Sequence, residues 1–341
     1  MDEQGARSAQ LFMTELMEQG AKRADAWKAE DKERIRERAA AFVNAAPEQT
    51  AMVPNTSYAF TAVVQALKGI HSKVLVVENE YPSLTLPLEA NQFITARVRV
   101  PKGGLRMADV KQAAMDHRAE VLVISHVQWL TGEAIDPIEI GRFCKKNGIL
   151  FMLDVTQSIG AIPLDFPAIN ADVMVCSNYK WMNAGLGTGL LWLSNSFMRD
   201  FPPVIAGFGS CEWDDEGWHY EPSIRSYEPG HENMAGLLAL EGAMKTKQAL
   251  GMDLIREKNL ELSDAFRDGL TSIQCDALAP SEFEFRSSIV CIPEQEGLFS
   301  HLDRHQIQCA RRDGYIRFGF HYHNTKEEVQ QTLSAIKGFT R

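Results

Sequence analysis

The chain has 341 residues, of which 45% are hydrophobic, 9% aromatic and 23% charged, a composition that excludes a disordered, collagen-like or low-complexity protein. Its length is sufficient for two domains. With 45 acidic and 35 basic residues the formal net charge is −10, so nucleic acid and anionic membranes, which require basic surface, are not expected as partners.

The N-terminal 20 residues are acidic and amphipathic, without the basic region and cleavage site of a signal peptide. No uninterrupted apolar stretch is long enough to span a membrane. The six cysteines have no CxxC or other paired spacing, which indicates reduced thiols rather than disulfides or a zinc site. We therefore expect a cytoplasmic protein that has no metal site.

The first part of the chain predicts an α/β domain. A densely charged surface helix is expected over residues 24–45, and a polar turn at 53–57 opens a second helix over 58–69. Helices over 107–118 and 137–147 separate short apolar runs that are typical of strands buried on both faces. These runs are residues 73–78, 120–125, 149–154, 172–177 and 189–193. The pattern indicates a three-layer large domain with a mostly parallel sheet.

Beyond Gly230 the pattern changes to that of a smaller α+β domain. The expected elements are helices over 234–250 and 252–270, strands over 287–292 and 315–320, and a helix over 325–337 that is capped by Asn324. We place the large, cofactor-binding domain at residues 20–245 and the small C-terminal domain at residues 246–341. Residues 1–19 are expected to pack with the small domain.

Polar residues follow several of the predicted strands, where ligands of open α/β sheets bind. They are Asn79 to Tyr81, Ser125 and His126, Asp154 and Gln157, and Ser177 and Lys180. Asp154 and Lys180 would face one crevice from neighbouring strand ends. Their spacing alone allows either a structural ion pair or a pair that binds a ligand.

The full set of groups suits pyridoxal 5′-phosphate. This cofactor needs a carboxylate at its ring nitrogen, a lysine that forms a Schiff base, a flat side chain to stack on, and hydroxyls with a helix N-terminus for its phosphate. Asp154 suits the ring nitrogen, and Lys180 suits the Schiff base and the later transfer of the substrate's α-proton. Gln157 could bond the phenolic oxygen. Residues 55–57, before a helix, offer hydroxyls and free amides to a phosphate.

Residues 154–193 resemble the pyridoxal-phosphate signature of the class V aminotransferases. The matching features are the aspartate, the glutamine three residues later, and the lysine before a GxGTG-like turn. Residues 80–83, 127–132 and 317–325 are similar to the isopenicillin N epimerase-like and cysteine desulfurase-like branch of that family. The likeness covers about residues 50–335 and implies the type I fold of pyridoxal-phosphate transferases.

The resemblance also implies a role for individual residues. It assigns Lys180 to the Schiff base, Asp154 to the ring nitrogen, Gln157 to the phenolic oxygen, Tyr81 to stacking, Thr56, Ser57, Ser177 and Tyr179 to the phosphate, and Arg317 to the substrate carboxylate. His231 stands where the family usually has a threonine that reaches the partner subunit's phosphate. The resemblance therefore implies a homodimer with its site at the interface.

Three further features receive a structural interpretation. His321 and His323 alternate with aromatic residues, but without a third ligand nearby they do not indicate a metal. The acidic run 212–216 is expected to form a surface loop near the dimer interface. Cys309 precedes the Arg312–Gly314 turn, whereas desulfurases of the family place their nucleophilic cysteine after such a turn. We interpret Cys309 as a packing thiol and expect no persulfide chemistry on it.

The sequence thus predicts a pyridoxal-phosphate-dependent enzyme that acts on a small amino acid through Lys180. An aminotransferase and a Cβ-elimination lyase are both open, because no motif specifies the step after loss of the α-proton. An amino-acid epimerase is an alternative. So are a non-catalytic or regulatory protein of the same fold, which His231 and the short N-terminal segment motivate, and an α/β binding protein in which Asp154 and Lys180 merely pair.

Overall fold

The large sheet has seven strands in the computed structural model, which describes residues 1–100, 104–278 and 286–339. The strands are β1 (Thr50–Val53), β2 (Lys73–Val77), β3 (Ile94–Val98), β4 (Val121–Ser125), β5 (Leu150–Asp154), β6 (Val173–Ser177) and β7 (Gly189–Leu193). Their order is β1-β7-β6-β5-β4-β2-β3, and β7 runs opposite to the other six. The prediction of a mostly parallel sheet is confirmed, with β1 and β3 as strands that the sequence analysis missed.

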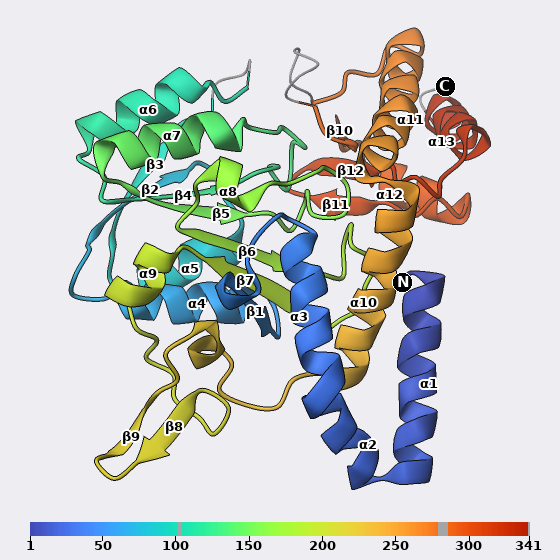
Figure 1. Ribbon diagram of the computed structural model, residues 1–341. Coiled ribbons are helices and arrows are strands. Elements are labelled where there is room, and N and C mark those ends of the chain that lie inside the picture. The colour runs from blue at the N-terminus through green and yellow to red at the C-terminus, as the bar shows by residue number, and fades with distance from the viewer. Residues whose placement is uncertain (101–103, 279–285, 340–341) are drawn as a thin grey trace.

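Helices cover both faces of this sheet and complete the three predicted layers (Figure 1). One face packs against α4 (Thr56–Leu67), α5 (Pro82–Ala90) and α9 (Asn195–Asp200). The other packs against α3 (Lys32–Ala41), α6 (Met107–Asp116), α7 (Pro137–Asn147), α8 (Phe166–Ile169) and α10 (Met234–Leu250). Except in the edge strand β3, alternate residues of each strand enter the two cores, as a pleated strand buried on both sides requires.

The N-terminal helices lie along one side of the large domain. α1 (Glu3–Gln19) packs along α10, and the two are side by side in Figure 1. Their backbones come close because neither Gly5 nor Gly242 has a Cβ: one added at Gly242 would lie 2.6 Å from the Gly5 Cα. α2 (Ala21–Ala26) and a π-helical turn (Trp27–Asp31) continue into α3, in place of the single helix expected over 24–45.

A buried ion pair fixes α3 to β1 and to the segment before α10. Arg36 on α3 and Glu228 are both almost fully buried. The Arg36 Nη1 and Nη2 atoms donate to the two carboxylate oxygens of Glu228 at 2.7 and 2.9 Å, and Nη1 also donates to the Thr50 carbonyl at 2.7 Å. Glu228 in turn accepts from the Met52 amide at 2.7 Å and from Lys32 at 3.1 Å. This ion-pair network ties three segments that are distant in sequence.

The C-terminal part forms a smaller α+β unit with its own core, as predicted. Its elements are α11 (Met252–Ser272), β10 (Ile289–Pro293), α12 (Leu298–Arg304), β11 (Ala310–Arg312), β12 (Tyr315–Gly319) and α13 (Lys326–Phe339). The strands form an antiparallel sheet in the order β10-β12-β11. The predicted cap of the last helix is wrong by one residue. Thr325 Oγ1 accepts from the Glu328 amide and the Glu328 carboxylate accepts from the Thr325 amide, whereas Asn324 Oδ1 accepts from the His321 amide.

The acidic run 212–216 is not a loop, contrary to the prediction. Cys211–Asp214 (β8) and Gly217–Tyr220 (β9) pair as an antiparallel hairpin that projects from the large domain (Figure 1). Gly217 at φ 122° allows the tight turn. A 3-10 turn (Ile224–Tyr227) follows, and another (Pro47–Gln49) precedes β1. In the described residues, no helix combines the length and the apolar character needed to cross a bilayer.

Candidate active site

All eight residues predicted to hold the cofactor line one cavity of about 280 Å³ at the carboxyl ends of the central strands. They are Thr56, Ser57, Tyr81, Asp154, Gln157, Ser177, Tyr179 and Lys180. Arg317 lines an adjoining cavity of about 560 Å³, which shares Tyr81, Gln157, Tyr179 and Lys180 with the first. The structure therefore brings the predicted site residues together.

Lys180 lies on the loop between β6 and β7, and its position depends on Gly160. Gly160 adopts φ 83°, and a Cβ at this position would lie 2.8 Å from the Trp181 carbonyl and 2.9 Å from the Met182 Cα. The absence of a side chain at Gly160 lets the lysine loop pack directly on the segment that follows β5. The Lys180 Nζ atom lies 5.2 Å from the centre of the Tyr81 ring and 5.8 Å from that of Tyr179.

Lys180 and Asp154 are both removed from bulk water and influence each other. Burial lowers the pKa of Lys180 to about 8; Asp154 opposes this shift, and Arg317 and Arg312 reinforce it. Burial raises the pKa of Asp154, against hydrogen bonds from Thr156 and the charge of Lys180. The Thr156 amide donates to Asp154 Oδ1 at 2.7 Å. A lysine with a lowered pKa is more often a neutral, nucleophilic amine near neutral pH.

A cluster of hydroxyls meets the N-terminus of α4. Ser177 Oγ lies 3.1 Å from Thr56 Oγ1 and accepts from the Thr56 amide at 3.0 Å. Thr156 Oγ1 lies 3.0 Å from Thr56 Oγ1 and accepts from the Ser177 amide at 3.1 Å. Ser57 exchanges a hydrogen bond with Ser83 at 2.7 Å. Hydroxyls beside the positive end of a 12-residue helix form a site that suits a phosphate.

The Gln157 side chain is held by its oxygen, which leaves its nitrogen without a partner. Trp181 Nε1 donates to Gln157 Oε1 at 2.9 Å, while Gln157 Nε2 is buried and has no hydrogen bond within the described residues. Trp181 stacks on His321, with ring centroids 5.4 Å apart and an angle of 16° between the ring planes. His321 Nε2 lies 3.0 Å from the Trp181 carbonyl oxygen. A buried amide N–H without a partner is a strong donor for a ligand.

Tyr81 and Trp129 line the same cavity as Lys180, and Glu80 lies buried behind them. The Tyr81 ring meets Trp129 edge-on at 5.6 Å, and Trp129 Nε1 donates to the Asn79 carbonyl at 2.9 Å. Glu80 is buried and accepts from the Ser125 hydroxyl at 2.6 Å and from the Tyr81 amide at 2.9 Å. These bonds hold Tyr81 at the start of α5, where its ring lines the cavity.

The adjoining cavity lies between the large domain and the small one. Arg317 on β12 donates to the Trp129 carbonyl at 2.5 Å, and burial lowers its pKa. Cys309 also lines this cavity, and burial raises the pKa of its thiol to about 11, which keeps it protonated and a poor nucleophile. Within the described residues, no group of three or more metal-ligating side chains exists around His321 and His323 or elsewhere.

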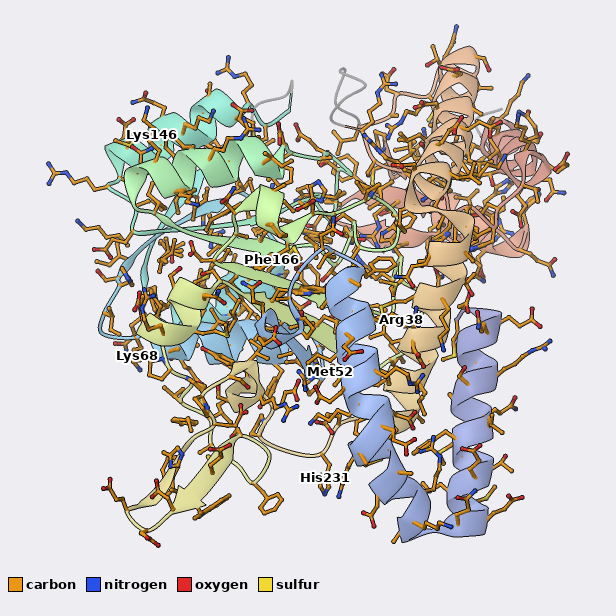
Figure 2. The ribbon with its side chains drawn as sticks, viewed as in Figure 1. Arg38, Met52, Lys68, Lys146, Phe166 and His231 are labelled. Atoms are coloured by element: carbon orange, nitrogen blue, oxygen red, sulfur yellow. The ribbon has the colours of Figure 1, made fainter. Side chains whose placement is uncertain are left out.

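His231 lies outside both cavities. It lines a third cavity of about 340 Å³ together with Tyr58, Gly187, Thr188 and Asn233. Gly187 and Thr188 separate this cavity from that of Lys180, because both residues line the two. Figure 2 labels His231 on the segment that leads into α10, where it is exposed to solvent.

Several residues that line the site were not among the predicted ones. Thr156, Ser83 and Trp129 contribute side chains to the first cavity. Trp181 and Arg312 line the second. Thr156 could have been found because it lies between Asp154 and Gln157. Nothing in the sequence indicates that the Trp181 indole would turn back to Gln157.

The mostly parallel sheet, the smaller antiparallel-sheet domain and the lysine and carboxylate at adjacent strand ends define a pyridoxal-phosphate-dependent enzyme of the type I fold. The family model "Aminotransferase class-V" matches residues 13–332, and the chain belongs to this family. The predicted family, fold, cofactor and enzyme class, a transferase or lyase, are thereby confirmed.

Individual relatives are distant but span most of the chain. A probable cysteine desulfurase of Methanothermobacter thermautotrophicus is 25% identical over 89% of this chain and 83% of its own length. The isopenicillin N epimerase of Amycolatopsis lactamdurans is 24% identical over 90% of this chain and 84% of its own. The fold is similar to that of the cystine C–S lyase C-DES, with a TM-score of 0.90, 18% identity, and 99% and 94% coverage of the two chains.

Proposed function

We propose that the chain is a Cβ-elimination lyase of a small amino acid, with Lys180 as the amine that bonds the cofactor's aldehyde. One observation carries the proposal: a half-buried lysine, a buried carboxylate and an amide N–H without a partner among the described residues line one cavity beside a hydroxyl-rich helix N-terminus. When bound, pyridoxal phosphate supplies an electron sink for a carbanion at the substrate's α-carbon.

The described residues fit this cofactor. The Gln157 Nε2 donor has no partner among them, as expected of a group that bonds a ligand oxygen. Asp154 is buried beside the lysine, so its carboxylate could hold a proton on a ring nitrogen. Thr56 and Ser177 would hold the phosphate with the first amides of α4, and Ser57 and Tyr179 would add hydroxyl donors. The Tyr81 ring would cover one face of the pyridine.

The chain's own residues would carry the proton transfers. Lys180, with its pKa lowered to about 8, would hold the cofactor and, as a free amine, would be available as a base. From its position in the cavity wall this amine would remove the substrate's α-proton. Arg317 would bind the α-carboxylate and so orient the α-carbon toward this amine.

The reaction class is supported by relatives rather than by a motif. Two of the similar proteins are named for cleavage at a carbon–sulfur bond or for removal of sulfur from cysteine. We therefore place elimination of a β-sulfur substituent first. Transamination is the second candidate, because the chain belongs to the class-V aminotransferase family.

The assembly, domain boundaries and location are also proposals. We propose a homodimer in which exposed His231 donates to a phosphate held by the partner subunit, because in its own subunit Gly187 and Thr188 separate it from the cofactor cavity. Boundaries at 20–245 and 246–341 agree with the separate core of the small sheet. All six cysteines are free, which is in keeping with a reducing, cytoplasmic location.

Borohydride reduction tests the role of Lys180. Reduction of the reconstituted protein should fix a phosphopyridoxyl group on the peptide that contains Lys180, as read by peptide mass spectrometry. Lys180→Ala should lose this label, while Lys247→Ala, which removes a buried lysine whose pKa is also lowered to about 8, should keep it. Label on another lysine would refute the assignment.

Product analysis tests the reaction class. Elimination from L-cysteine releases sulfide, ammonia and pyruvate, whereas transamination keeps nitrogen on the cofactor until a 2-oxo acid accepts it. Single-turnover release of ammonia without an added 2-oxo acid would support the lyase. Turnover that depends on the 2-oxo acid would establish the transferase instead.

A further inference from the structure

Two arginines lie on the same face of the hairpin formed by β11 and β12. Arg317 is paired with Ala310, and Arg312 with Tyr315. Because paired residues share a face and successive residues alternate, Arg312 and Arg317 point to one side of the sheet. The other side holds Ile316, which is buried in the core of the small domain. Arg311 also lies on that side and bonds Glu294 at 2.8 Å.

This face closes the 560 Å³ cavity above Lys180. Both arginines line it, and the charges of both act on Lys180. None of the described residues that line the cavity carries a carboxylate. In the described part of the chain neither guanidinium forms an ion pair: Arg317 donates to the Trp129 carbonyl, and Arg312 donates to the Arg311 carbonyl at 2.7 Å.

The cavity therefore holds more positive charge than one substrate carboxylate can neutralise. An amino acid brings one carboxylate, which Arg317 is placed to bind. Arg312 is exposed whereas Arg317 is half-buried, and the donors of Arg312 other than Nη1 have no hydrogen bond among the described residues, so they can bind a second anion. Arg312 and Arg317 are diagonal neighbours on paired strands, whose Cα atoms lie on the order of 7 Å apart. Their long side chains can therefore bind two anionic groups of one ligand that are separated by several bonds.

We propose that the substrate is an amino acid whose side chain ends in a second anionic group, with Arg317 on the α-carboxylate and Arg312 on that group. This inference rests on the function proposed above and narrows it. Three chemistries share the required feature: a side-chain carboxylate, a sulfinate, and a second amino-acid unit joined through a disulfide. An L-amino acid with a neutral side chain leaves Arg312 without an ionic partner.

Matched ligand pairs measure the contribution of the second anion. The full-length protein, reconstituted with pyridoxal phosphate, is titrated with L-aspartate against L-asparagine and with L-cysteine sulfinate against L-cysteine. L-Cystine forms a third arm. Dissociation constants come from the change in cofactor absorbance on binding. We expect the anionic member of at least one pair, or cystine, to bind about tenfold to a hundredfold more tightly than the neutral ligand, as one charge-assisted hydrogen bond contributes.

Variants at two neighbouring positions of β11 test whether Arg312 causes the preference for the anionic ligand. Arg312→Gln should reduce the ratio of the two dissociation constants to near one, and Arg312→Lys should restore part of it. Arg311→Gln is the matched control, because Arg311 is on the opposite face and should leave the ratio as in the parent. Circular dichroism and thermal melting establish that all three variants fold.

Two outcomes overturn the proposal, and they are distinguishable from failure of the proposed function. Equal affinity for neutral and anionic ligands in the parent protein refutes the inference alone, provided that L-alanine or L-cysteine changes the spectrum. An equal loss of preference in Arg311→Gln and Arg312→Gln also refutes it. If no amino acid changes the spectrum of the reconstituted protein, the proposed function and this inference fall together.

Discussion

Replacement of Glu228 by glutamine should destabilise the protein more than any exposed charge substitution. Glu228 accepts four hydrogen bonds or ionic contacts, from Arg36 twice, from the Met52 amide and from Lys32. Glu228→Gln keeps the size of the side chain but leaves the buried Arg36 guanidinium without a full countercharge. Breaking a buried ion pair from one side costs about 3–5 kcal/mol. Glu33, which bonds Arg36 Nε at 3.2 Å, compensates in part, so we expect a loss near the lower limit.

Urea unfolding at two pH values tests both the magnitude and its origin. Although burial opposes it, the Arg36 guanidinium holds the pKa of Glu228 below its ordinary value of 4.5. The contribution of this carboxylate to the free energy of unfolding is therefore complete above pH 4.5 and is lost as the pH falls through the lowered pKa. The gap between the parent and Glu228→Gln should narrow as the solution is acidified.

A control substitution separates this effect from a general effect of charge. Arg199→Gln removes an exposed partner of Asp200 and should change the unfolding free energy by less than about 0.5 kcal/mol. A loss below about 1 kcal/mol for Glu228→Gln, or a gap that does not depend on pH, would refute the assignment of the stability to this ion pair.

Three further predictions concern the lysine loop. The amine must be neutral to bond the cofactor, and burial lowers the pKa of Lys180 to about 8. The rate of cofactor loading, followed by absorbance, should therefore rise with pH, reach half its maximum near pH 8 and level off above it. A half-maximal rate near the ordinary pKa of 10.5 would contradict this. Trp181→Phe should reduce the unfolding free energy by about 1–3 kcal/mol, because it leaves Gln157 Oε1 without its donor; unchanged stability in urea would argue against that bond. Gly160→Ala should weaken cofactor retention, measured by dialysis, and lower the melting temperature by more than Gly251→Ala does. Both glycines have positive φ, but only at Gly160 would an added Cβ collide with the lysine loop.

The sequence predicts elements well where local signals agree. Residues 137–147 and 234–250 are helices with the predicted bounds, since Asp136 and Asn233 cap their first turns and glycines follow their last residues. Strands β1 and β3 were missed for different reasons. β1 is only four residues long and pairs with β7, far away in sequence. β3 is an edge strand whose Ile94 is exposed, so it lacks the apolar run of a central strand.

In the site too, residues marked by local sequence signals were predicted, whereas residues placed by long-range pairing were missed. Asp154 and Ser177 were predictable because parallel strands end at one edge of the sheet, and that edge holds the cavity. Arg312 was not identified as a site residue, since the register of a three-residue strand decides which face it occupies. The hairpin of β8 and β9 was missed because each strand has only four residues and its aromatic face, with Trp213 paired to Trp218, is exposed instead of packed on a core.

The stack of Trp181 on His321 connects the small domain to a side chain that lines the cofactor cavity of the large domain. Gln157 accepts its hydrogen bond from the Trp181 indole, whose flat face rests on His321, two residues beyond the end of β12. A rotation of the three-stranded sheet that separates these rings would free the Gln157 amide to turn, and it would then offer an acceptor where it now offers a donor. The contact between these two rings thus links the position of the small sheet to the polarity of the group that Gln157 presents to the cavity.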